Sequence, residues 1–386
     1  MSGAGGRRPP IPLSVVTGFL GSGKTTLLNR LLSDPALAGT AVIVNEFGEV
    51  GLDQLLVGQA DEGIVELSSG CLCCTIRGEL VTTLENLLRA LDNHRIERLD
   101  RVVIETTGLA DPAPVLQSVL LHPYLSIRYL LDGVVTVLDA ANGAATLAKH
   151  AEAARQIAVA DRIVLTKTDI ADPAATIAAA RALNPIAPIL DAANGEAEAG
   201  RLFGVSPFST EGKIDDVALW LSAGAEDGHD HGHDHHHDHD HGHGGHHHHG
   251  SHHHHDVSRH DARIRSFVLR RAAPIGICAL EDFLGRVLRA HGEQLLRIKG
   301  IVATTEDPGR PLVVQAAQKL FHPPARLPAW PSGDRRSVLV FIVQDMNDAE
   351  SDRLADEFAG IPATDRADLE VAAANPLAIP GFGGRF

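Results

Sequence analysis

A glycine-rich segment near the start of the chain limits the fold more than any other feature. The β-branched run at 15–17 predicts a buried strand, and the leucines between Leu27 and Leu32 predict a helix soon afterwards. Between them, residues 18–25 read Gly-Phe-Leu-Gly-Ser-Gly-Lys-Thr. This matches the pattern G-x-x-x-x-G-K-T, the phosphate-binding loop of nucleoside triphosphatases. A strand, a glycine loop and a helix in this order predict a nucleotide site.

The loop offers backbone N–H groups, a cation and a hydroxyl. Glycines let the backbone fold tightly enough for successive N–H groups to surround an anion, and the dipole of the following helix adds positive potential. Lys24 is expected to reach the terminal phosphates, and the Thr25 hydroxyl is expected to ligate Mg²⁺. The residues predicted to contact the nucleotide here are Gly18, Gly21, Ser22, Gly23, Lys24, Thr25 and Thr26.

A second strand-end segment, Val-Val-Ile-Glu-Thr-Thr-Gly at 102–108, belongs with this loop. Glu105 at the end of a buried strand is predicted to orient the Mg²⁺ shell or the attacking water. Gly108 is predicted to donate its N–H to the γ-phosphate. Together with Lys24 these two residues are the catalytic candidates, and a solvated strand cap is the alternative interpretation of Glu105.

The segment Ile-Val-Leu-Thr-Lys-Thr-Asp at 163–169 predicts base recognition. A strand that ends in [N/T]-K-x-D is typical of GTPases, where the aspartate accepts two hydrogen bonds that guanine alone offers and the lysine stem packs over the base. The residues concerned are Thr166, Lys167 and Asp169, with threonine in place of the commoner asparagine. The pattern favours GTP over ATP.

Three of the four cysteines, Cys71, Cys73 and Cys74, lie within four positions, between a predicted strand and a predicted helix. Three thiolates on a short loop suit Zn²⁺, with Co²⁺ as the alternative, and the fourth ligand would be water or a neighbouring side chain. Small buried residues in a turn and a redox pair of Cys71 with Cys74 are the other interpretations. The isolated Cys278 is expected to be a small core residue and is assigned no role.

The acidic segment at 45–53 follows the second predicted strand, where a nucleotide-sensing loop is expected. Glu46 and Asp53 are predicted to contact Mg²⁺ or the cysteine-bound metal. A solvated acidic loop is the alternative interpretation.

Apolar runs alternate with helical stretches as far as about residue 222, which predicts an α/β fold of the P-loop NTPase type with a doubly wound, mostly parallel sheet. Strands are predicted at 41–45, 64–67, 101–105, 134–138 and 162–166, and helices at 77–93 and 174–183. A smaller C-terminal α+β domain with a split, ferredoxin-like arrangement is predicted from strands at 263–270, 295–303, 312–317 and 337–344 and helices at 279–291 and 348–358.

Between the two domains, residues 228–255 hold seventeen of the 23 histidines and no apolar side chain. Such a stretch cannot bury enough apolar surface to order itself, so it is predicted to be a disordered linker that captures metal, with a plain spacer or a cloning tag as alternatives. The predicted organisation is an extension (1–12), a P-loop GTPase domain with the cysteines (13–222), the histidine-rich linker (223–262), the C-terminal domain (263–360) and a tail (361–386).

Charge and hydropathy exclude some classes of partner. A net charge of −15 argues against nucleic acid, whose phosphates need a basic surface. No apolar run is long enough to span a membrane, and the first residues carry no apolar signal segment. A cytoplasmic protein is therefore expected.

Taken together, these motifs resemble those of the CobW family of metal-handling P-loop GTPases, relatives of the hydrogenase and urease maturation GTPases. The resemblance covers nearly the whole chain, and in the C-terminal domain it includes Arg-Ile-Lys-Gly at 297–300. It implies a GTPase that uses GTP and Mg²⁺, binds Zn²⁺ or Co²⁺ through Cys71, Cys73 and Cys74, and delivers the metal to a client metalloprotein.

Two other functions are kept as alternatives. One is a non-enzymatic metal buffer in which the histidine tract is the working part, and the other is a P-loop kinase acting on a small molecule. The oligomeric state is open, with a homodimer as one alternative.

Overall fold

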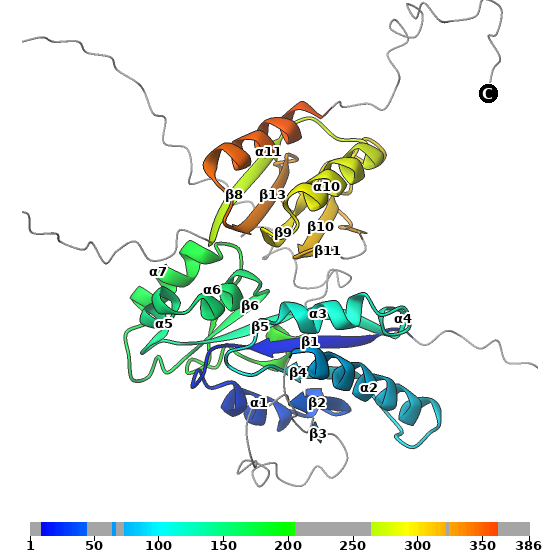
Figure 1. Ribbon diagram of the computed structural model, residues 1–386, viewed down its shortest axis with the longest axis vertical. Coiled ribbons are helices and arrows are strands. Elements are labelled where there is room, and N and C mark those ends of the chain that lie inside the picture. Colours follow the sequence, from blue (N-terminus) through cyan, green and yellow to red (C-terminus); the bar gives the residue numbers. More distant parts are fainter. Residues whose placement is uncertain (1–8, 45–63, 67–72, 205–263, 322–323, 362–386) are drawn as a thin grey trace, which may run out of the picture.

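The computed structural model describes residues 9–44, 64–66, 73–204, 264–321 and 324–361. An N-terminal α/β domain and a smaller C-terminal domain lie along the long axis of the molecule (Figure 1). The grey segments in Figure 1 are outside the described residues.

The N-terminal domain is built on a seven-stranded sheet in the order β3-β2-β4-β1-β5-β6-β7, and every neighbouring pair is parallel. The strands are β1 (Ile11–Thr17), β2 (Thr40–Val44), β3 (Ile64–Glu66), β4 (Arg101–Glu105), β5 (Tyr129–Asp139), β6 (Arg162–Thr166) and β7 (Ile189–Asp191). The helices are α1 (Lys24–Leu32), α2 (Cys73–Asp92), α3 (Ala113–Leu120), α4 (Leu125–Arg128), α5 (Gly143–Lys149), α6 (Ala151–Ala158), α7 (Ala174–Leu183) and α8 (Ala199–Leu202), with a 3₁₀ turn η1 (Pro35–Leu37).

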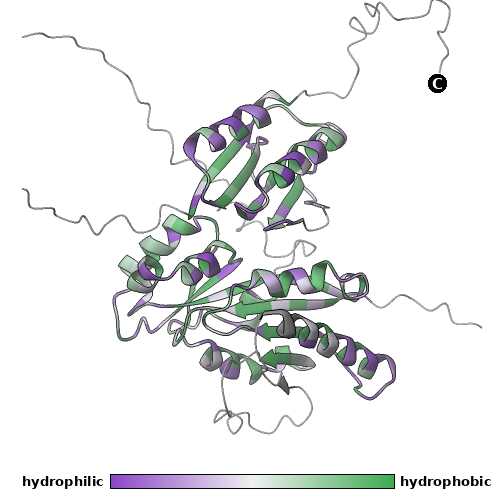
Figure 2. Cartoon of the chain, viewed as in Figure 1, coloured by the Kyte–Doolittle hydropathy of each residue, from purple (hydrophilic) through white to green (hydrophobic). Residues whose placement is uncertain are grey.

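Helices cover both faces of this sheet, because its strands are apolar on both faces. In β1, Leu13 and Val15 pack into a core with residues of α2 and α3, whereas Val16 packs on the opposite face with residues of α1 and α8. Figure 2 shows the strands as mostly hydrophobic and the helices as a mixture of hydrophobic and hydrophilic residues. The doubly wound parallel fold predicted from the sequence is therefore confirmed.

The C-terminal domain contains an antiparallel sheet in the order β11-β10-β9-β13-β8, with β12 paired to β10. Its elements are β8 (Ile264–Arg271), α10 (Ile277–His291), β9 (Leu295–Val302), β10 (Leu312–Ala317), β11 (Leu320–Phe321), β12 (Ala325–Arg326), β13 (Ser337–Gln344) and α11 (Asp348–Gly360). Since β13 lies between β8 and β9 and runs antiparallel to both, the predicted split arrangement is confirmed.

The two faces of the C-terminal sheet have different partners. Ile298 and Phe341 pack with α10 and α11 on one face. On the other face, Leu296 and Ile342 join the core of the N-terminal domain, and Val340 packs near Ile186 of that domain. The two domains therefore share apolar cores, and β13 is buried on both faces.

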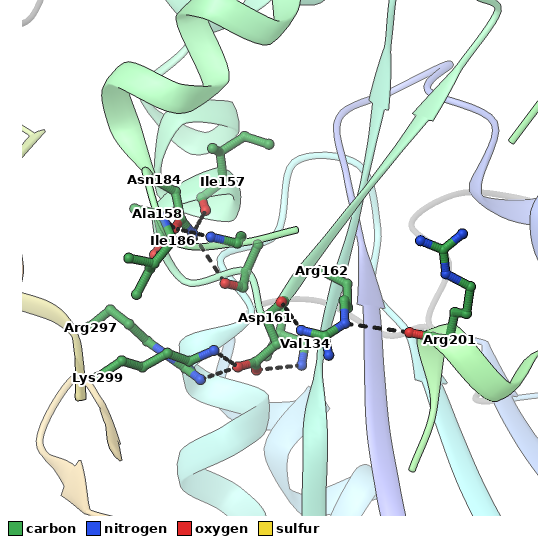
Figure 3. A network of polar contacts seen from close by, with 12 residues as sticks. Val134, Ile157, Ala158, Asp161, Arg162, Asn184, Ile186, Arg201, Arg297 and Lys299 are labelled. Carbon is green, nitrogen blue, oxygen red and sulfur yellow. Dashed lines mark hydrogen bonds and ion pairs between the residues drawn. The ribbon is translucent and has the colours of Figure 1, made fainter. Parts of the chain in front are cut away.

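A buried charge cluster also joins the domains (Figure 3). Arg297 and Lys299 of β9 both form ion pairs with Asp161, which lies between α6 and β6. Asp161 also accepts a hydrogen bond from the backbone N–H of Val134 at 2.9 Å. The two charged residues of the Arg-Ile-Lys-Gly motif therefore hold the C-terminal sheet to the N-terminal domain.

Three sequence expectations need correction. Helix α2 begins at Cys73, four residues before the predicted start at Arg77. Strand β5 begins at Tyr129 rather than at Val134. Cys278 is exposed in the first turn of α10 and is not a core residue, because the buried face of that helix is formed by Leu280, Phe283, Leu284 and Val287.

Candidate functional site

The segment between β1 and α1 has the backbone geometry of an anion-binding loop. Gly18, Gly21 and Gly23 have φ angles of 141°, 72° and 96°, which residues with side chains rarely adopt. At Gly18 a Cβ would also lie 2.3 Å from the carbonyl oxygen of Val137. Gly23 is the N-cap of α1. The loop therefore ends at a helix N-terminus, where free N–H groups and the helix dipole favour an anion.

Lys24 begins α1 and its ammonium is held by the loop itself. Nζ donates to the carbonyl oxygens of Gly18 at 2.9 Å and Phe19 at 3.2 Å. Burial lowers the pKa of Lys24, and the negative charge of Glu105 opposes that shift. A buried lysine whose hydrogen bonds, within the described part of the chain, go to loop carbonyls is placed to exchange them for phosphate oxygens.

The start of α1 and the end of β4 bring a hydroxyl and a carboxylate together. The Thr25 hydroxyl donates to Oε1 of Glu105 at 3.2 Å, and the Glu105 side chain is buried. The next residue, Thr106, donates its hydroxyl to that of Thr17 at 2.8 Å. Strands β1 and β4 are neighbours in the sheet, so their carboxyl ends meet at the phosphate loop.

The loop after β4 lies directly against the phosphate loop. A Cβ at Gly108 would lie 2.6 Å from the backbone nitrogen of Leu20, so the two loops approach as closely as only a glycine allows. The side-chain amide of Gln156 in α6 donates to the carbonyl oxygens of Gly108 at 3.3 Å and Ala110 at 2.9 Å. Gln156 was not among the residues predicted from the sequence.

Two residues of the predicted base-recognition motif form hydrogen bonds to the phosphate loop. The Thr166 hydroxyl donates to the carbonyl oxygen of Ser22 at 2.7 Å. The ammonium of Lys167 donates to the carbonyl oxygen of Gly21 at 3.0 Å and forms an ion pair with Asp139. Lys167 itself has a φ of 60°, a left-handed conformation that these contacts hold in place.

The last residue of this motif is open to solvent, whereas Thr168 is half-buried. Asp169 is exposed, and the hydroxyl of Thr168 donates to Asp191 at 2.7 Å. Asp139, the last residue of β5, was missed by the sequence analysis. The signal was a carboxylate directly after a buried strand, the same feature that identified Glu105.

Only part of the cysteine motif falls within the described residues. Cys73 and Cys74 are the first two residues of α2, whereas Cys71 lies outside the described ranges. The predicted short loop is therefore helical from Cys73 onward. Among the described residues, no group of three or more histidine, cysteine, aspartate or glutamate side chains is arranged to hold a metal ion.

Other predicted features also fall outside the described residues. They are Glu46, Asp53 and the histidine tract at 228–255. Across the ranges that the structure describes, no helix is long and apolar enough to cross a membrane.

Comparison with known proteins agrees with the two domains of the chain. Residues 12–191 match the family described as CobW/HypB/UreG, nucleotide-binding domain, and residues 264–360 match the cobalamin synthesis protein cobW C-terminal domain. The chain belongs to the CobW family. It is 33% identical to the zinc chaperone YjiA of Escherichia coli over 334 residues, which cover 86% of this chain and 94% of that protein.

One further relative and one solved structure extend the comparison. The zinc chaperone CobW of Pseudomonas aeruginosa is 34% identical over 376 residues, covering 88% of this chain and 89% of that protein. The crystal structure of the Zn(II)-bound YjiA GTPase from E. coli superposes with a TM-score of 0.64 and 28% identity, over 92% of this chain and 100% of that one. The whole two-domain architecture of this CobW-family chain is thus similar to a solved structure.

Proposed function

We propose that this chain is a GTP-hydrolysing metallochaperone. In this proposal it binds Zn²⁺, with Co²⁺ as the alternative, through Cys71, Cys73 and Cys74, and transfers the metal to a client metalloprotein in a nucleotide-dependent way. The observation that carries the proposal is the joint geometry of the phosphate loop with Lys24 and Glu105. The names of the relatives, zinc chaperones YjiA and CobW, support the choice of cargo.

The phosphate loop has the features that a nucleoside triphosphate needs. Lys24 would contact the terminal phosphates, and N–H groups at the start of α1 would surround them. The hydroxyl oxygen of Ser22 is buried and has no hydrogen-bond partner among the described residues, which suits an anion with several acceptor oxygens. Gly108 would donate its N–H to the γ-phosphate, and the close approach of Gly108 to Leu20 places it beside the loop.

Thr25 and Glu105 fit a magnesium ion. Their hydroxyl and carboxylate oxygens lie 3.2 Å apart, and hard oxygen donors of this kind are the ligands that Mg²⁺ prefers. When bound, the ion would neutralise charge on the phosphate oxygens. Glu105 would hold the ion's shell or the attacking water in place, which is the role that its buried position at the end of β4 supports.

Guanine recognition is proposed for Thr166, Lys167 and Asp169. The first two connect the base-binding segment to the phosphate loop, so a base and its phosphates would be read by one rigid unit. Asp169 is exposed, as a carboxylate that accepts from a base edge must be before the base arrives.

The position of Cys73 and Cys74 supports metal binding. Both begin α2, and together with Cys71 they place three cysteines within four positions of the chain, as a thiolate site for Zn²⁺ requires. An incomplete set of three sulfur ligands suits a carrier that must release its cargo. Because free thiols and GTP are both kept in the cytoplasm, the proposal places the protein there.

The test compares two variants with the wild-type chain. Lys24→Ala should lower phosphate release from GTP at least about 100-fold, since one lost stabilising group at a charged transition state costs this much. Replacing Cys71, Cys73 and Cys74 together by serine should remove tight Zn²⁺ binding, measured by chelator competition, and leave GTP hydrolysis in place. Phosphate release no faster than in a protein-free control, or tight Zn²⁺ binding retained by the serine variant, would contradict the proposal.

A further inference from the structure

Helix α6 and the residues next to it, 150–161, contact both loops of the nucleotide site. We refer to these residues as the α6 segment. The ring of His150 packs against the ring of Phe19 in the phosphate loop, with centroids 4.5 Å apart. The amide of Gln156 donates to the carbonyl oxygens of Gly108 and Ala110 in the loop after β4. One short helix is therefore attached to both loops.

The same segment is attached to the C-terminal domain at two points. Nε of Arg155, the neighbour of Gln156, donates to the side-chain oxygen of Gln344 at 2.9 Å. Gln344 is the last residue of β13. At the end of the segment, Asp161 pairs with Arg297 and Lys299 of β9 (Figure 3). Two adjacent residues of α6 thus contact different parts of the molecule: Gln156 contacts the loop after β4, and Arg155 contacts the C-terminal sheet.

Gln156 is an unusual choice for its position. Its side chain is 1% exposed and lies on the helix face that also buries Ala153 and Ile157. Its side-chain oxygen has no hydrogen-bond partner among the described residues. Because a buried acceptor without a partner is unfavourable, packing alone would favour an apolar residue of similar size here. The hydrogen bonds that the side-chain NH₂ group donates to two loop carbonyl oxygens therefore account for a glutamine at this position.

We propose that Gln156 is a positioning residue that couples the loop after β4 to the docking of the C-terminal domain. The inference rests on the proposed function, in which Gly108 binds the γ-phosphate of GTP. A shift of Gly108 toward that phosphate moves the carbonyl oxygens that Gln156 holds. Since α6 is a regular helix, the shift is passed to Arg155 and its contact with Gln344. The C-terminal sheet is therefore docked differently with GTP than with GDP.

A second hydrogen bond also connects the surroundings of this loop to the C-terminal domain. Helix α3 begins directly after the loop, at Ala113, and its Gln117 donates to the side-chain oxygen of Gln318 in the turn between β10 and β11 at 3.0 Å. The loop after β4 is thus flanked by two helices that each hydrogen-bond to the C-terminal domain. A substitution at Gln156 leaves the residues of the loop and the residues that contact the C-terminal domain unchanged.

The experiment measures amide hydrogen exchange in the full-length chain saturated with Mg²⁺ and either GDP or guanosine 5′-(β,γ-imido)triphosphate. In the wild-type protein, exchange in peptides covering 294–300 and 338–346 should differ at least about threefold between the two nucleotides. In Gln156→Met, which keeps the side-chain volume and removes the amide, this difference should fall below about 1.5-fold. A merely structural role would change both nucleotide states equally and leave the difference in place.

Two further variants keep the test decisive. Gln344 is half-exposed and accepts the hydrogen bond from Arg155. Gln344→Ala should therefore reduce the exchange difference between the nucleotide states even if Gln156→Met folds poorly. Arg286→Ala breaks a surface ion pair with Glu357 inside the C-terminal domain and should keep the full difference. This inference alone would be overturned by either of two results. One is an exchange difference between the nucleotide states that stays at its wild-type size in both Gln156→Met and Gln344→Ala. The other is the absence of any exchange difference in a wild-type chain that hydrolyses GTP. A chain that does not bind GTP would overturn the proposed function and this inference with it.

Discussion

Glu105 acts on two neighbours in different ways. Its Oε1 accepts a hydrogen bond from the Thr25 hydroxyl, and its negative charge raises the pKa of Lys24 against the effect of burial. An uncharged side chain of the same shape could still accept the hydrogen bond, but it could not supply the charge. The charge of one residue therefore influences both the proposed metal ligand and the proposed phosphate ligand.

The variant Glu105→Gln separates these contributions. We expect GTP hydrolysis to fall by roughly 10- to 100-fold and half-maximal activity to need more Mg²⁺, because a neutral amide is a weaker partner for the cation and its water shell. Phosphate release measured across a Mg²⁺ titration checks this. The matched control is Glu97→Gln, at an exposed position, which should behave like the wild type. An unchanged rate and Mg²⁺ dependence in Glu105→Gln would remove Glu105 from the site.

At the scale of elements, β9 packs against the N-terminal domain on one face and against α10 and α11 on the other. The pairing of β9 with β13 skips Leu296, so this residue faces the N-terminal domain beside Arg297 and Lys299, while Ile298 faces α10 and α11. Gly300 ends the motif and lies opposite Leu339 of β13. A Cβ there would lie 1.9 Å from the carbonyl oxygen of Val338.

The variant Gly300→Ala should destabilise the C-terminal domain. The added methyl group meets backbone atoms of β13, which cannot move without breaking the sheet, so we expect a loss of about 1–3 kcal/mol or more in the free energy of unfolding. Urea unfolding followed by circular dichroism measures it. Gly309→Ala, at an exposed turn with no backbone atom nearby, is the control. Equal stability of the two variants would show that β13 does not need this glycine.

Most elements could be predicted because their pattern is local. β4, β6, β10, β13 and α7 have the predicted bounds, since each is an apolar or alanine-rich run ended by a polar residue. The start of α2 was missed because its leucine stripe begins only at Leu80. The start of β5 was missed because Asp132 interrupts the apolar run. In the fold, Asp132 is paired with Arg101 and accepts from the Ser14 hydroxyl at 3.1 Å.

In the candidate site, too, some contacts follow from a local sequence pattern and others do not. The contacts of Lys24 lie within the phosphate-loop motif, so their positions follow from a short sequence. Gln156 and Ala110 are 46 positions apart, and Asp161 and Arg297 are 136 positions apart, so no local pattern marks these partners. The proposed nucleotide ligands can therefore be predicted from a local sequence pattern, whereas the residues that connect them to the rest of the molecule cannot.

At the scale of the whole molecule, the two domains are held together by buried charge as well as by apolar packing. Burial lowers the pKa of Lys299 to about 8, and its pairing with Asp161 opposes the shift. Nearby positive charge from Arg297 and Lys299 holds the pKa of Asp161 far below its usual value, although burial acts to raise it. The interface is therefore sensitive to pH on the alkaline side.

The direction of this effect follows from proton linkage. The pKa of a lysine in the unfolded chain is near 10.5, so between about pH 8 and pH 10.5 the unfolded state keeps a proton that the folded state has released. The contribution of Lys299 to the free energy of unfolding therefore rises with pH in this window, by at most about 3 kcal/mol. Lys299→Met lacks this contribution, so the stability difference, wild type minus variant, should increase across the window.

Urea unfolding at several pH values between about 7.5 and 10.5 measures that difference. Lys319→Met removes a lysine that is half-exposed on the surface and serves as the control, with no expected trend. A wild-type advantage over Lys299→Met that stays constant with pH would show that Lys299 keeps its proton in the folded protein.

The proposed metallochaperone function depends on coupling between the nucleotide and the metal. By linkage, if GTP changes the affinity for Zn²⁺, then Zn²⁺ changes the affinity for GTP by the same factor. The direct measurement is a Zn²⁺ titration against a competing chelator, with the full-length chain saturated by Mg²⁺ and either GDP or guanosine 5′-(β,γ-imido)triphosphate. We expect the two Zn²⁺ affinities to differ at least about tenfold, equivalent to about 1.4 kcal/mol of coupling, and the difference to vanish in the serine variant of Cys71, Cys73 and Cys74. Equal Zn²⁺ affinities in the two nucleotide states would contradict nucleotide-dependent metal transfer by this protein.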